Sequence, residues 1–221
     1  MAKNLMEVLP QTTSISGPPA RLRRRQSRAE RSEDVRKAIF AAAAKVIGER
    51  GYAEASISRI TEIAGIAQGT FYLYFESRQA LFDELLLVLG QEMLAKLHQA
   101  ASGAQNFFEV EERGARALFE YIDQQPGFSR ILHEAEFAAP LAYERHYRML
   151  CERYADSLRR AVKAGDIRDL HPDELEAMVH MLIYARSGLL HNARQKASQG
   201  ETADRQACIQ AYMRLVRHGV R

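Results

Sequence analysis

The sequence lacks any apolar run of the roughly 18 to 20 residues that a membrane-spanning helix needs, and its N-terminus carries no apolar core like that of a signal peptide. It has only two cysteines, Cys151 and Cys208, which are too few and too far apart to define a disulfide framework. We therefore expect a cytoplasmic protein with reduced thiols and no membrane partner.

Sequence motifs that would indicate an enzyme are also missing. None of the seven histidines has a glutamate three residues before it, so the Glu-x-x-His pair of di-iron helical bundles is absent. There is no His-Glu-x-x-His, Walker loop, Gly-x-Ser-x-Gly or Cys-x-x-Cys either. We expect that the protein is not an enzyme and that it has no cofactor and no metal site.

Proline is absent between Pro19 and Pro126, and no stretch of useful length alternates apolar with polar residues. Apolar residues instead recur at helical spacing, which predicts an all-α fold. Serines, prolines and glycines at the breaks predict where helices begin and end. The expected helices cover about residues 32–50, 56–64, 67–75, 78–101, 107–125, 127–137, 140–164, 172–197 and 203–220.

Positive charge gathers at the N-terminus. The formal net charge is only +3, yet the first 37 residues hold nine Lys or Arg against four Asp or Glu. Residues 1–31 contain three prolines and six arginines without an amphipathic period, so we expect a disordered basic arm there. Such an arm favours a polyanionic partner; a merely solvated tail is the alternative.

Two short helices joined by a turn at Gly65, and supported by a preceding helix, form the pattern of a helix-turn-helix. Phe71 and Phe75 are four residues apart, so both should face the core and leave Tyr72 and Leu73 outside it. A helix-turn-helix sets its second helix into a DNA major groove while the first crosses the backbone. The expected partner is therefore double-stranded operator DNA.

The segment from Ser56 to Leu81, SISRITEIAGIAQGTFYLYFESRQAL, closely resembles the signature of the TetR/AcrR regulators. The resemblance is sharp over residues 33–85 and implies a ligand-responsive, homodimeric repressor. It implies a DNA-binding domain over residues 32–77 and a helical domain for effector binding and dimerisation over residues 78–221. Ala67, Gln68 and Leu73 depart from the common family pattern of serine, a basic residue and histidine, which puts the operator sequence in doubt.

The exposed residues of the motif each have a possible DNA contact. Gln68 can bind adenine and Leu73 can contact a thymine methyl group. Hydroxyl groups, the N-terminus of the second helix and Arg78 can meet phosphates. Alternatively, Tyr74 belongs to the core, Leu73 packs on the first helix and Arg78 is a solvated charge. The predicted DNA-binding residues are Ser56, Arg59, Gln68, Gly69, Thr70, Tyr72, Leu73, Tyr74 and Arg78.

The middle helices are interpreted as a ligand chamber, again by resemblance, because aromatic residues concentrate there. His133 and Glu136 share a helical face and could orient a polar ligand group or bind metal, with a satisfied buried pair as the alternative. Arg145, Arg148 and Arg186 could meet a carboxylate or phosphate, and the expected effector is a small, hydrophobic or acyl-type molecule. The candidate ligand residues are Phe107, Tyr121, Phe128, Leu132, His133, Glu136, Tyr143, Tyr147 and Tyr184.

The last two expected helices offer more apolar surface than one face needs, and the resemblance implies that they form a four-helix bundle between two subunits. The alternative is that they only complete the core of one subunit. The predicted dimerisation residues are Met178, Met181, Leu182, Leu189, Leu190, Ile209, Met213 and Val216. Two alternative functions are transcriptional activation and non-specific, architectural binding of DNA.

Overall fold

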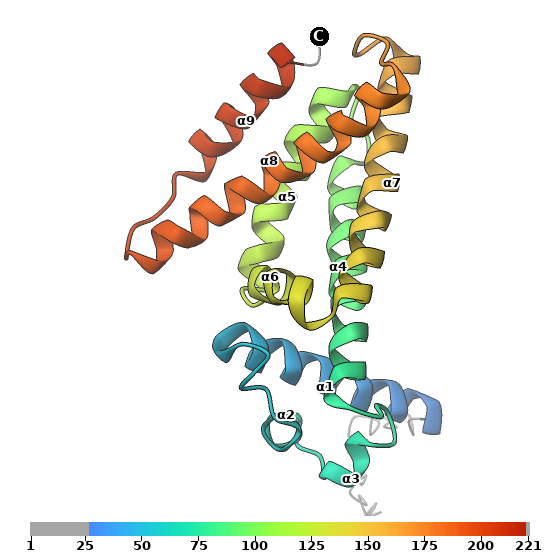
Figure 1. Cartoon of the computed structure of the whole chain (residues 1–221), viewed down its shortest axis with the longest axis vertical. Helices are drawn as coiled ribbons and strands as arrows, with labels where there is room; N and C mark the ends of the chain where they lie inside the picture. Colours follow the sequence, from blue (N-terminus) through green and yellow to red (C-terminus); the bar gives the residue numbers. More distant parts are fainter. Residues whose placement is uncertain (1–26, 220–221) are drawn as a thin grey trace, which may run out of the picture.

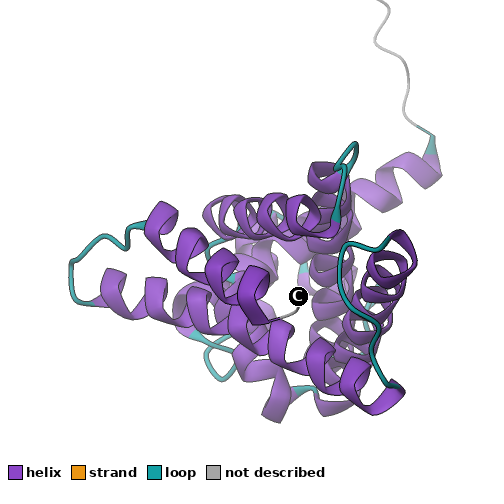
Figure 2. Cartoon of the chain, turned by 90° about the horizontal axis from the view of Figure 1, so that it is seen from above, coloured by secondary structure: helices purple, strands orange, loops and turns teal. Residues whose placement is uncertain are grey.

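The computed structural model describes residues 27–219, apart from the side chains of residues 194, 197 and 198. All regular elements in this part of the chain are helices, which confirms the predicted all-α fold (Figure 2). They are α1 (Arg28–Arg50), α2 (Ile57–Ala64), α3 (Gln68–Phe71), α4 (Arg78–Ala101), α5 (Phe107–Gln124), α6 (Phe128–Ala138), α7 (Pro140–Ala164), α8 (Pro172–Ser198) and α9 (Arg205–Gly219).

The first helix begins earlier than predicted. Ser27, not Ser32, is its N-cap, and Ser27 and Glu30 form a capping box in which each side chain accepts from the other's backbone N–H. Arg28 and Arg31 therefore lie on α1 and not in the basic arm. The rest of that arm, residues 1–26, lies outside the described residues.

The third helix is shorter than predicted. Only Gln68–Phe71 is α-helical, and Ala67 at its N-cap offers no side-chain hydrogen bond. The chain continues in tight turns, in which the N–H groups of Tyr74 and Phe75 both donate to the carbonyl of Phe71. Gly69 and the missing capping hydroxyl both disfavour a longer helix, but the turns preserve the spacing of the two phenylalanines.

The helices pack around two hydrophobic cores. The N-terminal core joins α1, α2 and α3 to α4, α6, the second half of α5 and the start of α7, and its fully buried members include Ile39, Phe82 and Ile131. The C-terminal core joins α5, α7, α8 and α9 around residues such as Leu158 and Val216. Helix α4 runs from the small N-terminal helices up into the larger helical region (Figure 1).

Helix α6 contacts the C-terminal end of α1, so it ties the two regions together. A Cβ atom on Gly48 would overlap the Cα of Gly127, which means that two backbones touch here. Arg130 donates to the carbonyl of Glu49 (2.9 Å) and pairs with Glu134 (2.8 Å). Glu134 in turn accepts from the backbone N–H of Tyr52 (2.5 Å), just past the end of α1.

Candidate nucleic-acid interface

Two phenylalanines anchor the third helix, as predicted. Phe71 and Phe75 are both buried, with ring centroids 5.7 Å apart, and Phe75 meets the Phe40 ring of α1 edge-on at 5.3 Å. Ile60 of α2 is buried in the same core. Because both aromatic rings point inward, the backbone between them has a fixed orientation.

The residues between these anchors face outward. Tyr72 is 57% exposed and Leu73 is 82% exposed, so Leu73 does not pack on the first helix. Gln68 and Gly69 are also exposed, and a Cβ on Gly69 would meet no atom within 4 Å. The turn thus presents a phenol, an aliphatic side chain, an amide and a bare backbone on one surface.

The second helix is held by local hydrogen bonds. The Ser56 hydroxyl oxygen accepts from the backbone N–H of Arg59 (3.3 Å), and Ser56 itself is exposed. Gly65 ends the helix in a left-handed conformation (φ +68°), which a glycine adopts without strain. Ser56 is exposed and Arg59 is half-buried, so both stay accessible at the start of this helix.

Two of the predicted DNA-binding residues also have contacts within the subunit. Tyr74 is half-buried and packs against the N-terminal core. Arg78 is not simply a solvated charge, because its guanidinium lies 4.4 Å from the centre of the Tyr52 ring and donates to the carbonyls of Tyr52 (3.2 Å) and Ala53 (3.1 Å). This tie between α4 and the end of α1 has no signal in the sequence, since its acceptors are backbone atoms.

Six of the nine candidate ligand residues line one hollow of about 620 Å³ between α6, α7 and α8. Ser129, Ser187, Leu190, His191 and Gln195 complete its described lining. The six candidates are Phe128, Leu132, His133, Glu136, Tyr143 and Tyr184. His133 and Glu136 are exposed, so they do not form a buried pair.

The other three candidates lie elsewhere. Phe107 is buried in the C-terminal core and borders a different hollow, at the start of α5. Tyr121 is buried in the N-terminal core, where its hydroxyl donates to the carbonyl of Leu89 (2.9 Å) and burial raises its pKa. Tyr147 lies beside the hollow, and its hydroxyl is 2.7 Å from Nδ1 of His180, a contact that the sequence did not indicate.

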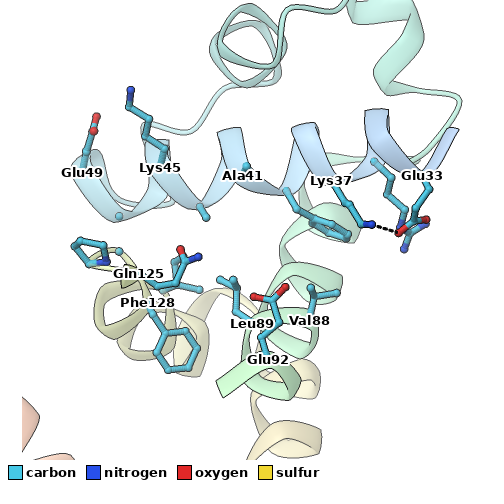
Figure 3. A pocket seen from close by; sticks show the side chains of 17 residues that line it. Glu33, Lys37, Ala41, Lys45, Glu49, Val88, Leu89, Glu92, Gln125 and Phe128 are labelled. Atoms are coloured by element: carbon cyan, nitrogen blue, oxygen red, sulfur yellow. Dashed lines mark ion pairs between the residues drawn. The ribbon is translucent and has the colours of Figure 1, made fainter. Parts of the chain in front are cut away.

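Another hollow, of about 770 Å³, separates α1 from α4 and α6 (Figure 3). Its walls are apolar at Phe40, Val88 and Leu89, and its edge carries charges of both signs, including the Lys37–Glu33 pair (3.8 Å). Of the sequence-predicted ligand residues, only Phe128 reaches it. No net charge or polar cluster in this hollow indicates a particular ligand.

The predicted dimerisation residues divide into two groups. Leu182, Ile209, Met213 and Val216 are buried in the C-terminal core of the subunit, so for these four the alternative interpretation holds. Met178, Leu189 and Leu190 are half-buried, and Met181 is exposed. Tyr184 on α8 and Leu215 on α9, which were not predicted for this role, are also exposed apolar residues.

Arg186, a candidate for binding an effector anion, already has a carboxylate partner in the subunit. Its Nη2 donates to Glu111 Oε2 (3.0 Å), and both residues are buried. Arg145 and Arg148 are exposed, and Arg148 pairs with Glu144 (2.5 Å). Within residues 27–219, no helix is long and apolar enough to span a membrane, and no three His, Cys, Asp or Glu side chains form a group that could hold a metal ion.

The N-terminal helices are similar to those of known regulatory proteins. Residues 39–85 match the model described as bacterial regulatory proteins, tetR family. The chain is 26% identical over 157 residues to the HTH-type transcriptional regulator YhgD of Bacillus subtilis (strain 168). The aligned region covers 69% of this chain and 82% of that protein.

Solved structures share the whole architecture. The fatty acid degradation regulator FadR from Bacillus halodurans superposes with a TM-score of 0.71 at 20% identity, covering 81% of this chain and 93% of that one. FadR from Bacillus subtilis, in complex with stearoyl-CoA, superposes with a TM-score of 0.72 at 17% identity, covering 84% and 99%. At these identities the similarity establishes the fold alone.

Proposed function

We propose that this chain is a DNA-binding transcriptional regulator of the TetR family, and that it is a homodimeric repressor released from its operator by a small molecule. The observation that carries the proposal is the outward-facing turn at Tyr72 and Leu73, anchored on both sides by Phe71 and Phe75. At this position of a helix-turn-helix, an exposed leucine can contact a base edge in the major groove and an exposed tyrosine hydroxyl can donate to a phosphate.

The proposed contacts divide the surface into two roles. Gln68 and Leu73 read base edges in the major groove, through adenine and a thymine methyl group. Ser56, Arg59, Thr70 and Tyr72 bind phosphates and fix the orientation of the helix. Gly69 lets the backbone approach the DNA closely, while Tyr74 and Arg78 act mainly by supporting the turn and the start of α4.

Dimerisation follows from the size of one recognition surface, which covers only half a site. Helix-turn-helix dimers span half-sites about 34 to 36 Å apart, or a multiple of that distance. Met181 and Tyr184 on α8 and Leu215 on α9 are exposed apolar residues on the two helices proposed to pair. Burying them against a second subunit would remove that exposed area from water.

The effector is proposed to bind the hollow between α6, α7 and α8. Its aromatic lining suits a largely apolar molecule, and the stearoyl-CoA bound to FadR of Bacillus subtilis supports an acyl-type effector. The other face of α6 is fixed to the end of α1 by Arg130 and Glu134. A ligand that binds better when α6 is displaced would therefore favour a form with wrongly spaced recognition helices.

The test begins with genomic footprinting of the purified full-length protein, followed by fluorescence anisotropy on the site that it locates. Gln68→Ala is expected to weaken operator binding about tenfold, because it removes a bidentate base contact of about 1–3 kcal/mol. Gln91→Ala on α4, also an exposed glutamine, is the matched control and should change nothing. Equal affinity for operator and random duplex would instead favour the architectural protein.

A reporter gene placed downstream of the located site shows whether the protein represses or activates transcription. Repression predicts higher expression when the protein is removed, and activation predicts lower expression. The sequence also predicts that a basic arm, residues 1–31, contributes to DNA binding. Loss of residues 1–26 should flatten the salt dependence of affinity, because fewer counterions are released.

A further inference from the structure

One buried histidine lies between α7 and α4 without a hydrogen-bond partner. His146 of α7 is 1% exposed, and neither its Nδ1 nor its Nε2 atom has a partner among the described residues. A neutral imidazole carries one N–H donor and one acceptor nitrogen, so both groups are buried here at a cost in free energy. Buried polar side chains in native proteins generally have partners, and an exception needs an explanation.

The imidazole ring lies in a notch in the backbone of α4. A Cβ atom on Gly90 would overlap the Nδ1 and Cε1 atoms of His146, so the ring occupies the space that a side chain would need. Gly90 is buried in the middle of α4, where glycine lowers the stability of the helix relative to alanine. The contact thus combines two unfavourable choices, although an alanine against an aliphatic side chain would also fill an apolar interface.

The buried charged groups of α5 and α8 are paired with each other. Arg186 of α8 pairs with Glu111 of α5 (3.0 Å). The Oε2 atom of Glu111 also accepts from the hydroxyls of Tyr154 on α7 (2.6 Å) and Tyr212 on α9. These groups satisfy one another, so none of them supplies a counter-charge to His146.

The other helices around the ring supply no counter-charge either. Glu92 of α4 is exposed beside the hollow next to α1, and Glu136 of α6 borders the hollow between α6, α7 and α8. The ring of His180 on α8 is bound to a tyrosine hydroxyl, and Tyr143, one turn away on α7, is neutral at pH 7. Burial lowers the pKa of His146, and no charged group contributes to the shift.

We propose that His146 and Gly90 form an acid-sensitive contact between α7 and α4. The neutral ring fits the notch, whereas a protonated ring would bring a charge into the interior with no carboxylate to neutralise it. Protonation therefore drives the ring out of the notch and separates the two helices at this point. A consequence for operator affinity rests on the proposed function, because α4 leads to the DNA-binding helices (Figure 1), but the acid sensitivity does not.

The pH range follows from the two positions of the ring. In water the ring has an ordinary pKa of about 6.5, and in the notch its pKa is lower. The open form therefore binds more protons than the closed form as pH falls below about 6.5, so acid favours opening. The ratio of open to closed form should rise up to about tenfold between pH 7.5 and pH 5.5, and should change little above pH 7.5.

Two measurements on the full-length protein without DNA test this proposal. NMR titration of the histidine Cε1–H resonances gives the pKa of each ring, and the variant His146→Met identifies the resonance of His146. Hydrogen exchange followed by mass spectrometry gives protection factors for residues 86–94 and 142–150 at pH 7.5 and pH 5.5. The matched control is His98→Met, which removes an exposed histidine of α4.

The proposal expects that His146 titrates below pH 6.5 and that protection of both segments falls by up to about tenfold in acid. The loss should occur in the parent and in His98→Met, but not in His146→Met. A ring that titrates at pH 6.5 or above, unchanged protection in the parent, or an equal loss in His146→Met would overturn the proposal.

Gly90→Ala gives a second test, which does not require His146→Met to fold. Its methyl group occupies the notch, so the ring of His146 should titrate at an ordinary pKa and protection should no longer depend on pH in this range. A retained low pKa in this variant would contradict the role of the notch. Failure of the proposed function would appear separately, as equal affinity for operator and random duplex at pH 7.5.

Discussion

The two hydrophobic cores of this protein differ in the polar groups that they bury. The N-terminal core is built from aliphatic and aromatic side chains, its one fully buried tyrosine, Tyr121, bonds to a backbone carbonyl, and charged groups such as Arg130 and Glu134 lie at its edge. The C-terminal core contains the buried Glu111–Arg186 pair and two tyrosine hydroxyls. The ion pair and the two hydroxyls join α5, α7, α8 and α9 through directional hydrogen bonds, which apolar packing does not supply.

The largest expected effect comes from breaking the buried ion pair. Arg186→Met leaves the Glu111 carboxylate buried without a cation and should lower the free energy of unfolding by about 3–5 kcal/mol. The measurement is urea denaturation followed by circular dichroism.

The double variant Arg186→Met/Glu111→Leu separates charge from packing. Removing both charges should restore most of the lost stability, because well-packed apolar residues can replace a buried pair at little cost. A double variant as unstable as the single one would mean that the loss arises from shape and not from charge.

A smaller effect is expected where α1 and α6 touch. Gly48→Ala places a methyl group against the backbone of Gly127, and the overlap should cost about 1–3 kcal/mol, partly offset by the better helix propensity of alanine. Gly69→Ala on α3, measured without DNA, is the matched control. A Cβ there meets nothing within 4 Å, so alanine should stabilise by up to about 1 kcal/mol. Thermal unfolding of both variants tests the contrast, which a stabilised Gly48→Ala protein would contradict.

The smallest effect concerns pH at the edge of the N-terminal core. Burial raises the pKa of Glu134, but the hydrogen bond from Tyr52 and the ion pair with Arg130 outweigh it, so the pKa lies below the ordinary value. The stability that Glu134 contributes is therefore present above about pH 4.3, the ordinary glutamate pKa, and is lost as pH falls through its folded value.

Glu134→Gln tests this dependence. The variant should be less stable than the parent at pH 7 by about 1–2 kcal/mol, because a hydrogen bond to a charged group contributes about 1.5–3 kcal/mol and partial exposure of this site reduces that value. The difference should shrink between pH 5 and pH 3, as the parent's carboxylate becomes protonated. Parallel stability curves across this range would exclude the carboxylate as the cause.

Much of the fold could be predicted because its signals are local. Helix ends marked by Ser77 or Gly165 were correct, since capping residues act within one turn. The start of α1 was missed because Ser27 and Ser32 are both plausible caps, and only the pairing with Glu30 distinguishes them. The length of α3 was overestimated because Phe71 and Phe75 keep the same spacing in the turns that replace its last part, while Gly69 and the uncapped start disfavour a longer helix.

The interior contacts could not be predicted in the same way. Glu111 and Arg186 are 75 residues apart, and no periodic pattern or neighbouring motif in the sequence indicates that they form a pair. The same holds for Tyr147 and His180, and for Arg78, whose partners are backbone carbonyls. Residue type indicated a chamber between the helices, but only the packing of α7 against α8 decides which aromatics border it.

The meeting of Gly48 with Gly127 has a mechanical consequence. Where helices interlock through side chains, turning one against the other requires those side chains to leave their grooves. No side chains interlock where Gly48 meets Gly127. At this point the polar contacts of Arg130 and Glu134, and not the glycines, oppose rotation of α6 against α1.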